Sequence, residues 1–322
     1  MIWKIILGLI LSGIALYFTL QGTDLSMIIE KCTKVSWVFW IGVGSLFVIQ
    51  QFLRAFRQQR IIQTEVSDYT WFESHTLLCI SFLCINTFPI RLGELARPIL
   101  LERQRHISIS SGLALVFLER IVDLLAAMIM IMTTLSFASF SFSAEYDWFE
   151  QLQSVSQVGV WILTFILVVS IVFAKNIKSI APKISHQFLD FLSQISTMRL
   201  VEIIFSTIVI WSISCLMYIC AAIGFSIEGI GFFEGMGILS STMLGMAPPS
   251  APGFAGTYEA AFMVALYSFV SIEKDTAFAM AICFHAWVNF VQAVTGIFSL
   301  QYIEISFKDL TRRILGQSQP DS

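Results

Sequence analysis

Long runs without a charged residue dominate the chain. They occupy 5–23, 35–53, 74–90, 124–144, 151–174, 203–227, 235–258, 260–272 and 276–303. A helix needs roughly 20 consecutive apolar residues to cross a bilayer. The runs that meet this need are 5–23, 35–53, 124–144, 151–174, 203–227 and 276–303. We therefore expect about six full membrane spans; the helix of the third starts before its charge-free run, near Ser110.

The remaining three runs are irregular. Run 74–90 ends at a proline, run 235–258 contains three prolines, and run 260–272 is too short to span without tilt. Broken helices in membranes are tolerated only where they are buried in protein or line a wet cavity. The residues expected to break these helices are Pro89, Gly93, Pro249, Pro252, Gly253 and Gly256.

Charged loop residues predict the orientation, because Lys and Arg are retained on the cytoplasmic side. Basic residues gather after the second span, in 91–105, in 175–199 and in the tail. Loops 145–150 and 228–234 carry Asp or Glu without Lys or Arg. We expect both termini in the cytoplasm and these two loops outside, together with the loop of Lys31 and Lys34.

The same rule puts both flanks of 71–106 in the cytoplasm and both flanks of 236–271 outside. Each segment is therefore expected to enter and leave the membrane on one side, as one of two oppositely oriented re-entrant helical hairpins. The alternative is two ordinary kinked spans in each segment. We expect a single integral membrane domain over 1–305 and a short cytoplasmic tail over 306–322.

The two hairpins resemble each other. They read Asn86-Thr-Phe-Pro89-Ile-Arg91-Leu-Gly93-Glu94 and Pro252-Gly-Phe-Ala-Gly256-Thr-Tyr-Glu259. Each has a proline break, then glycine, then a glutamate that opens a helix, and each precedes a long span with polar residues. This order predicts an inverted repeat, a transporter design in which broken helices meet near the midplane. Chance similarity between Pro/Gly turns is the alternative.

Composition narrows the class of protein. Hydrophobic residues make up 57% and charged residues 13% of the chain, against about 25% charged residues in soluble domains. The mean hydropathy is +0.80. These values exclude a soluble enzyme, a disordered chain and a secreted disulfide scaffold, and the net charge of −3 argues against nucleic acid. We predict an all-α polytopic protein of the inner cell membrane.

Three charged residues interrupt the third span. They are Glu119, Arg120 and Asp123. A charge at the bilayer centre costs roughly 2.5–3.5 kcal/mol on insertion scales. Arg120 can pair with Asp123 three residues on, and the remaining charge needs a partner, for which we expect Arg91 or Arg97. The three residues either lock hairpin to span or contact a ligand; an interfacial helix end is the alternative.

Arg91, Glu94 and Arg97 share one helical face, because they are three residues apart. Arginine binds phosphate or carboxylate through forked donors, so an anionic head group is the natural ligand. A solvated amphipathic face, continued by Arg103 and Arg105, is the alternative.

The second hairpin and the span after it carry a different set of candidate polar residues. Glu259 either caps a helix N-terminus or faces the cavity, where it would bind a cation, a proton or an amine. His285 and Asn289 lie four residues apart on the last span, as packing residues or as ligands. No HExxH, GxSxG, P-loop or Cys/His cluster occurs. The six cysteines are interpreted as small buried residues. We expect no metal, cofactor, disulfide framework or nucleophilic catalysis.

Three motifs resemble the lysylphosphatidylglycerol synthase transmembrane region, a flippase-like membrane domain. They are Pro89-Ile-Arg91-Leu-Gly93-Glu94-Leu-Ala-Arg97, Glu119-Arg120-Ile-Val-Asp123 and Pro252-Gly-Phe-Ala-Gly256-Thr-Tyr-Glu259. The resemblance covers most of the chain and implies movement of lipids or lipid-linked molecules, such as aminoacylated phospholipids, polyprenyl-linked sugars or hopanoid-type lipids. Two-part members add a soluble aminoacyl-transfer domain after this region. Only a short tail follows the last span here, so lysyl transfer is not implied.

We therefore expect a lipid flippase-like transporter and not an enzyme. The candidate binding residues are Arg91, Glu94, Arg97, Glu119, Arg120, Asp123, Glu259, His285 and Asn289. The expected partners are a phospholipid or polyprenyl-linked lipid, the membrane, and either a second copy of the chain or an envelope-assembly enzyme. The rival hypotheses are a membrane-embedded transferase that uses Glu259 or His285 as a base, and a non-catalytic subunit of an envelope-assembly complex.

Overall fold

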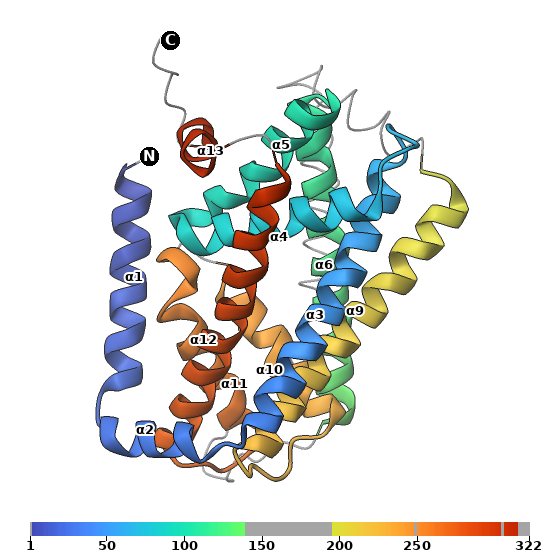
Figure 1. Ribbon diagram of the computed structural model, residues 1–322. Helices are drawn as coiled ribbons and strands as arrows, with labels where there is room; N and C mark the ends of the chain where they lie inside the picture. The colour runs from blue at the N-terminus through green and yellow to red at the C-terminus, as the bar shows by residue number, and fades with distance from the viewer. Residues whose placement is uncertain (1, 139–194, 248–249, 304–305, 315–322) are drawn as a thin grey trace.

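The computed structural model describes residues 2–138, 195–247, 250–303 and 306–314 (Figure 1). Over these residues the chain consists of helices and short connections, without a strand. This confirms the helical class. The loops predicted around Asp147 and Lys178, and the predicted span 151–174, lie outside the described residues.

Three described helices are long and apolar enough to cross a membrane. They are α3 (Trp37–Ile62), α9 (Thr197–Gly224) and α12 (Lys274–Ser299), which η3 (Leu300–Tyr302) extends. The first helix, α1 (Ile2–Leu20), has a shorter apolar stretch. Helix α6 (Ile109–Phe137) has 29 residues and contains the three predicted intramembrane charges. The number of full spans stays a prediction.

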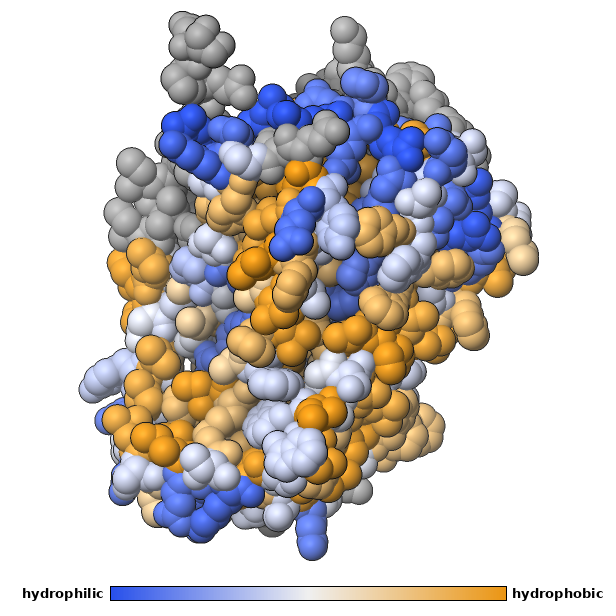
Figure 2. All heavy atoms as spheres, viewed as in Figure 1, coloured by the Kyte–Doolittle hydropathy of each residue, from blue (hydrophilic) through white to orange (hydrophobic). Residues whose placement is uncertain are grey.

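The surface has the polarity of a membrane protein. Figure 2 shows hydrophilic residues gathered at the two ends of the molecule and hydrophobic residues over much of the surface between them. Large apolar side chains such as Ile10 of α1, Ile41 of α3 and Phe205 of α9 are exposed. An apolar surface of this extent is unusual for a soluble monomer and suits contact with lipid chains.

Both predicted hairpins contain a helix, a break and a second helix. The first consists of α4 (Trp71–Thr87), η1 (Pro89–Leu95) and α5 (Ala96–Arg105). The second consists of α10 (Phe232–Gly245), η2 (Pro252–Phe254) and α11 (Thr257–Phe269). The two breaks touch each other, because η1 packs against η2. Whether the segments are re-entrant in a bilayer stays a prediction.

The first helices of the two segments begin alike, which the motif comparison missed. A Glu73 carboxylate oxygen accepts the Thr70 N–H at 2.8 Å, and a Glu234 oxygen accepts the Gly231 N–H at 3.0 Å. Two aromatic residues separate each capped residue from its glutamate, in Trp71-Phe72 and in Phe232-Phe233. A glutamate at this third helical position satisfies an N–H that the helix leaves without a partner.

The same order of elements occurs twice: α3, α4, η1, α5, α6 and then α9, α10, η2, α11, α12. In Figure 1, α3 rises toward the end that holds both termini, whereas α9 descends from it. Helices α6 and α12 also run in opposite directions. Equivalent elements of opposite direction are what an inverted repeat produces.

Each broken segment packs into its own hydrophobic cluster. Leu77 of α4 and Leu100 of α5 belong to one, and Phe262 of α11 and Phe278 of α12 to the other. The first cluster also takes in Leu310 of α13 (Phe307–Ile314). Part of the predicted tail is therefore a helix packed against α5 and η1.

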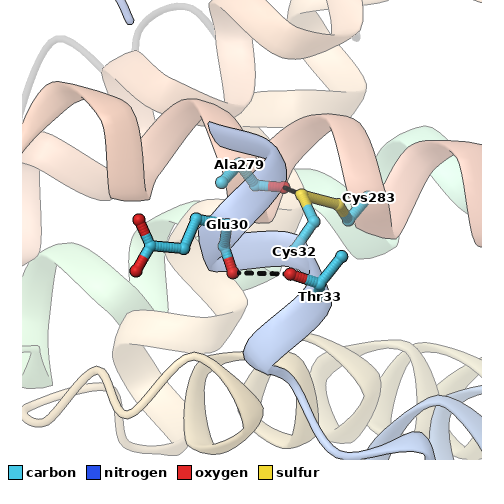
Figure 3. The surroundings of a disulfide bond; sticks show 5 residues. All are labelled: Glu30, Cys32, Thr33, Ala279 and Cys283. Atoms are coloured by element: carbon cyan, nitrogen blue, oxygen red, sulfur yellow. Dashed lines mark hydrogen bonds between the residues drawn. A yellow bond between two sulfur atoms is a disulfide. The ribbon is translucent and has the colours of Figure 1, made fainter. Parts of the chain in front are cut away.

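Two cysteines correct the expectation that all six are merely small buried residues. Cys32 of α2 (Leu25–Lys34) and Cys283 of α12 form a disulfide bond (Figure 3). They lie 251 residues apart in the sequence, so local spacing carries no sign of the pair. The other four cysteines are free thiols, and Cys79, Cys84 and Cys215 are buried.

Helix α3 corrects a second expectation. The charge pattern ends the second span at residue 53 and assigns Arg54, Arg57 and Arg60 to a cytoplasmic loop. The helix instead continues to Ile62, and Arg57 is 2% exposed. Arg57 stays inside the bundle because Asp123 of α6 supplies the opposite charge at 2.7 Å. Counting charge-free residues cannot detect a charge that a distant helix neutralises.

Gly93 holds the first break against α4 and yields a test of the fold. A Cβ atom on Gly93 would overlap the backbone of Cys84 and Ile85, whereas one on Gly13 of α1 would meet nothing within 4 Å. We expect Gly93→Ala to cost more than the about 1–3 kcal/mol of a typical overpacked core, because backbone cannot move aside. Gly13→Ala is the control. Thermal unfolding in detergent measures both, and equal melting temperatures would contradict this packing.

Candidate functional site

A cavity of about 440 Å³ lies beside the contact between the two breaks. Asn86 of α4 and Glu94 of η1 line it from the first segment, and Phe254 of η2 from the second. Helices α3, α6, α9, α10, α11 and α12 and the residues just after α10 supply the rest of the wall. The volume falls within the range of about 300–1,000 Å³ found for small-molecule sites. Its lining includes Leu244, which is exposed at the end of α10.

One wall of the cavity is basic. Arg54 of α3 and Arg120 of α6 both line it. The Arg54 guanidinium lies 5.3 Å from the centre of the Trp211 ring, within cation–π range. Among the described residues, Arg54 has no carboxylate within ion-pair distance. Arg120 lies 3.9 Å from Asp123, at the limit of an ion pair.

Asp123 is held mainly by Arg57, not by Arg120 as the spacing predicts. The two terminal nitrogens of Arg57 donate to the two carboxylate oxygens of Asp123 at 2.7 and 3.2 Å. One of them also donates to the Thr207 hydroxyl of α9 at 2.9 Å. This fork neutralises Asp123 from behind the cavity wall. Arg54 and Arg120 therefore keep much of their positive potential toward the cavity.

Arg97 and Glu119 form a second buried pair. Arg97 donates to Glu119 and, at 3.3 Å, to the Ser81 hydroxyl, and both charged side chains are at most 3% exposed. The pair links α5 to α6, so Arg97 is the partner that Glu119 was predicted to need. Neither residue is part of the cavity lining. The geometry favours the locking role over direct contact with a ligand.

The charges around the basic wall do not cancel. Among the described side chains, three arginines (Arg54, Arg57 and Arg120) and two carboxylates (Glu94 and Asp123) lie in this wall or directly behind it. The Arg97–Glu119 pair further from the cavity adds one charge of each sign. One positive charge is left over. Burying a net charge is costly, so this wall favours an anion in the cavity.

Several buried polar atoms of residues that line the cavity have no hydrogen-bond partner in the described part of the chain. Both amide atoms of Gln51, which is 1% exposed and lines the cavity, have no hydrogen-bond partner among the described residues. The Trp211 ring nitrogen and the Arg120 Nε have none either. Buried polar groups are normally paired, and a polar ligand or water in the cavity would satisfy these.

Another wall carries an acid–base pair. The Nδ1 atom of His285 lies 2.6 Å from one carboxylate oxygen of Glu259, and the other oxygen accepts the Gly256 N–H at 2.7 Å. His285 stacks on Tyr258 with ring centres 4.0 Å apart. Glu259 thus has the cap role considered for it; it is not part of the cavity lining and meets the cavity only through His285.

Gly256 makes this turn possible. Its φ is 86°, which glycine adopts readily and other residues rarely do. A Cβ atom there would also overlap the Ser12 carbonyl oxygen of α1. The break therefore needs glycine for both its conformation and its packing.

A family model for the lysylphosphatidylglycerol synthase TM region matches residues 5–296. The match covers both broken segments and the residues of both buried ion pairs. The chain belongs to this family. Neither a curated protein nor a solved structure matches it. The family is that of a membrane region connected with lipid handling, in agreement with the predicted resemblance.

The predicted binding residues of this family member fall into three groups. The cavity is lined by Glu94, Arg120, Asp123, His285 and Asn289. Arg97, Glu119 and Glu259 are buried and are not part of the lining. The side chains of Pro89 and Arg91, and the whole of Pro249, lie outside the described residues. Gly93, Pro252 and Gly253 lie within the 3₁₀ turns of the breaks.

Sequence reasoning missed the contribution of α3. Gln50, Gln51 and Arg54 line the cavity, and Arg57 anchors Asp123. Their spacing of three or four residues places them on one helical face. That polar stripe at the end of an apolar run was the available signal, but the prediction divided it: Gln50 and Gln51 fell within the expected span 35–53, and the charge rule assigned Arg54 and Arg57 to a loop.

The described residues contain no group of three or more His, Cys, Asp or Glu side chains placed to hold a metal ion.

Removing Asp123 tests whether the Arg57 pair is buried. Asp123→Ala leaves the Arg57 charge without its carboxylate, and an unpaired buried charge typically costs about 3–5 kcal/mol. We expect loss of folded protein in detergent, with substantial recovery in the double variant Arg57→Leu with Asp123→Leu. The measurement is monodispersity and melting temperature by fluorescence-detected size exclusion.

The control is Glu202→Ala, which removes the partly exposed partner of Arg60. A surface pair contributes about 0–1 kcal/mol, so this variant should melt near the wild type. If the Asp123→Ala and Glu202→Ala proteins melted at the same temperature, the burial of the Arg57 charge would be contradicted.

Proposed function

We propose that this protein moves a lipid with an anionic head group across the membrane. The observation that carries the proposal is the cavity beside the two touching breaks, in whose basic wall the described arginines outnumber the described carboxylates. Family membership supports lipid handling. On this proposal the substrate is a phospholipid or polyprenyl-linked lipid, and the protein is a transporter and not an enzyme.

Arg54 and Arg120 are the proposed head-group ligands. Both line the cavity, and arginine matches a phosphodiester through two parallel donors. The free amide of Gln51 can complete the contact as a donor. The acyl chains would leave past Leu244 and Ala247, which are exposed and line the cavity.

The proposed movement is alternating exposure of the cavity to the two sides of the membrane. Helical hairpins that meet at breaks can open one side at a time, as broken helices do in transporters with inverted repeats. Gly93 and Gly256, each in close contact with a neighbouring helix, would set the limits of that movement.

The proposed orientation has both termini in the cytoplasm. They lie near one end of the molecule, whereas α2 lies at the other (Figure 1). The Cys32–Cys283 disulfide joins α2 to α12, and disulfides persist in oxidising compartments outside the cytoplasm. This supports an external α2, as the alternation of spans predicts despite Lys31 and Lys34, in the inner membrane of a cell. A homo-oligomer or an envelope-assembly partner stays a prediction.

Lysine substitutions test the head-group ligands. Lys keeps the charge of Arg54 or Arg120 but loses the forked donors. We expect Arg54→Lys and Arg120→Lys to fold and to lower the rate of lipid translocation about tenfold, equivalent to about 1.4 kcal/mol. The assay is dithionite accessibility of a fluorescent phosphatidylglycerol in proteoliposomes.

Arg313→Lys is the matched control, because Arg313 is exposed on α13. Its rate should equal that of the wild type. Equal rates for all three variants would remove the arginines from the site. Turnover of the lipid to a new product in detergent, where translocation has no meaning, would favour the transferase hypothesis instead.

Labelling tests the orientation. Single cysteines replace Ser67, in the loop between α3 and α4, and Glu228, in the loop between α9 and α10, both of which are exposed. An impermeant maleimide should label Glu228→Cys in intact cells and Ser67→Cys only after permeabilisation. Labelling of both from the same side would contradict the proposed arrangement.

A further inference from the structure

The Glu259–His285 pair is buried and yet adjoins the cavity. Glu259 is 4% and His285 is 9% exposed, and only His285 is part of the lining. Their side chains approach to 2.6 Å. The imidazole stacks on Tyr258, whose hydroxyl lies 3.1 Å from that of Tyr218. Head-group binding by the basic wall makes no use of this arrangement.

The neighbouring helices and turns contribute the other ionisable groups near the pair. Around the cavity they are Tyr258 of α11, Tyr218 of α9, Arg54 of α3, Arg120 and Asp123 of α6, and Glu94 of η1. The residues that α4, α10 and η2 contribute to the lining carry no titratable side chain. Helix α2 offers Lys31, which pairs with Glu273, and the described side chains of α1 include Tyr17, which is exposed.

The charge of the pair changes by one with a single proton. With an imidazolium the pair is neutral, and with a neutral imidazole it carries the charge of the Glu259 carboxylate. The basic wall carries one positive charge in excess. The site is therefore balanced in two states: empty with the proton absent, or loaded with one anion and one proton. The mixed states leave a net charge inside the bundle, which is costly.

The pair is also connected to the second break. Glu259 holds the Gly256 N–H with the oxygen that does not face His285. Gly256 begins α11, and the preceding turn η2 touches η1. A proton gained or lost by the imidazole thus changes the partner of the same carboxylate that holds the break.

We propose that the Glu259–His285 pair takes up a proton together with the anionic ligand, so that proton and anionic lipid cross the membrane together. This inference rests on the proposed function and adds the source of energy, a proton gradient. By linkage, the anion strengthens proton binding by the same factor by which the proton strengthens anion binding, typically about 5- to 150-fold.

Calorimetry of the purified chain tests the coupling. The probe is dihexanoylphosphatidylglycerol, titrated into the protein in detergent in two buffers of different ionisation enthalpy. We expect binding to take up about one proton per lipid in titrations carried out between about pH 5 and 8. Glu259→Gln and His285→Gln should bind the lipid without taking up a proton. Each variant is first checked for monodispersity.

His75→Gln is the matched control. His75 is a partly buried histidine of α4 that stacks on Trp71 and is not part of the cavity lining. It should keep the proton uptake of the wild type. Uptake lost in His75→Gln, or kept in a folded His285→Gln, would overturn the assignment of the proton to this pair.

Measurements on the wild-type protein distinguish the failure of proton coupling from the failure of the proposed lipid transport. Lipid binding without proton uptake overturns the coupling and leaves lipid transport standing, whereas no lipid binding at any pH overturns both. In proteoliposomes the coupled protein should translocate labelled phosphatidylglycerol faster when a pH gradient is imposed along the direction of movement. A rate independent of the gradient would overturn the coupling.

Discussion

The fork between Arg57 and Asp123 joins α3 to α6 inside the bundle, and the cavity depends on it. Both side chains are at most 3% exposed, and the two hydrogen bonds occupy both oxygens of Asp123. Breaking such a pair leaves a buried charge, which costs several kcal/mol. Because Asp123 is satisfied from behind, the arginines on the cavity side stay available. This one interaction thereby joins two helices and leaves the cavity wall with a positive charge.

Each half of the chain contains a buried acid–base pair after its break, and the two pairs differ in their basic residue. In the first half Arg97 of α5 meets Glu119 of α6, and in the second Glu259 of α11 meets His285 of α12. Each pair joins the helix after a break to the long helix that follows. The basic group of the first pair is a guanidinium, whereas that of the second is an imidazole. Two pairs in similar positions are thus suited to different tasks, one to structure and one to response.

Close packing at glycine brings the breaks into contact. Gly93 lies against the backbone of α4, and Gly256 lies against Ser12 of α1. Side chains at these points would overlap α4 and α1 and displace the two breaks from these helices. The Asn86–Gln292 hydrogen bond of 2.6 Å adds a direct link between α4 and α12. Backbone contact, supported by a few polar bonds, positions the site.

The sequence by itself determined the helical membrane class, the position of both breaks, the family, and five residues of the cavity wall, because apolar runs, prolines and motifs are local patterns. Tertiary structure decided which charges meet. Arg57 finds Asp123 across 66 residues, and Cys32 finds Cys283 across 251. It also moved Arg54 from a predicted loop to the cavity wall. A charge is tolerated inside a membrane only through its partner, and that partner lies on another helix, which no local pattern can identify.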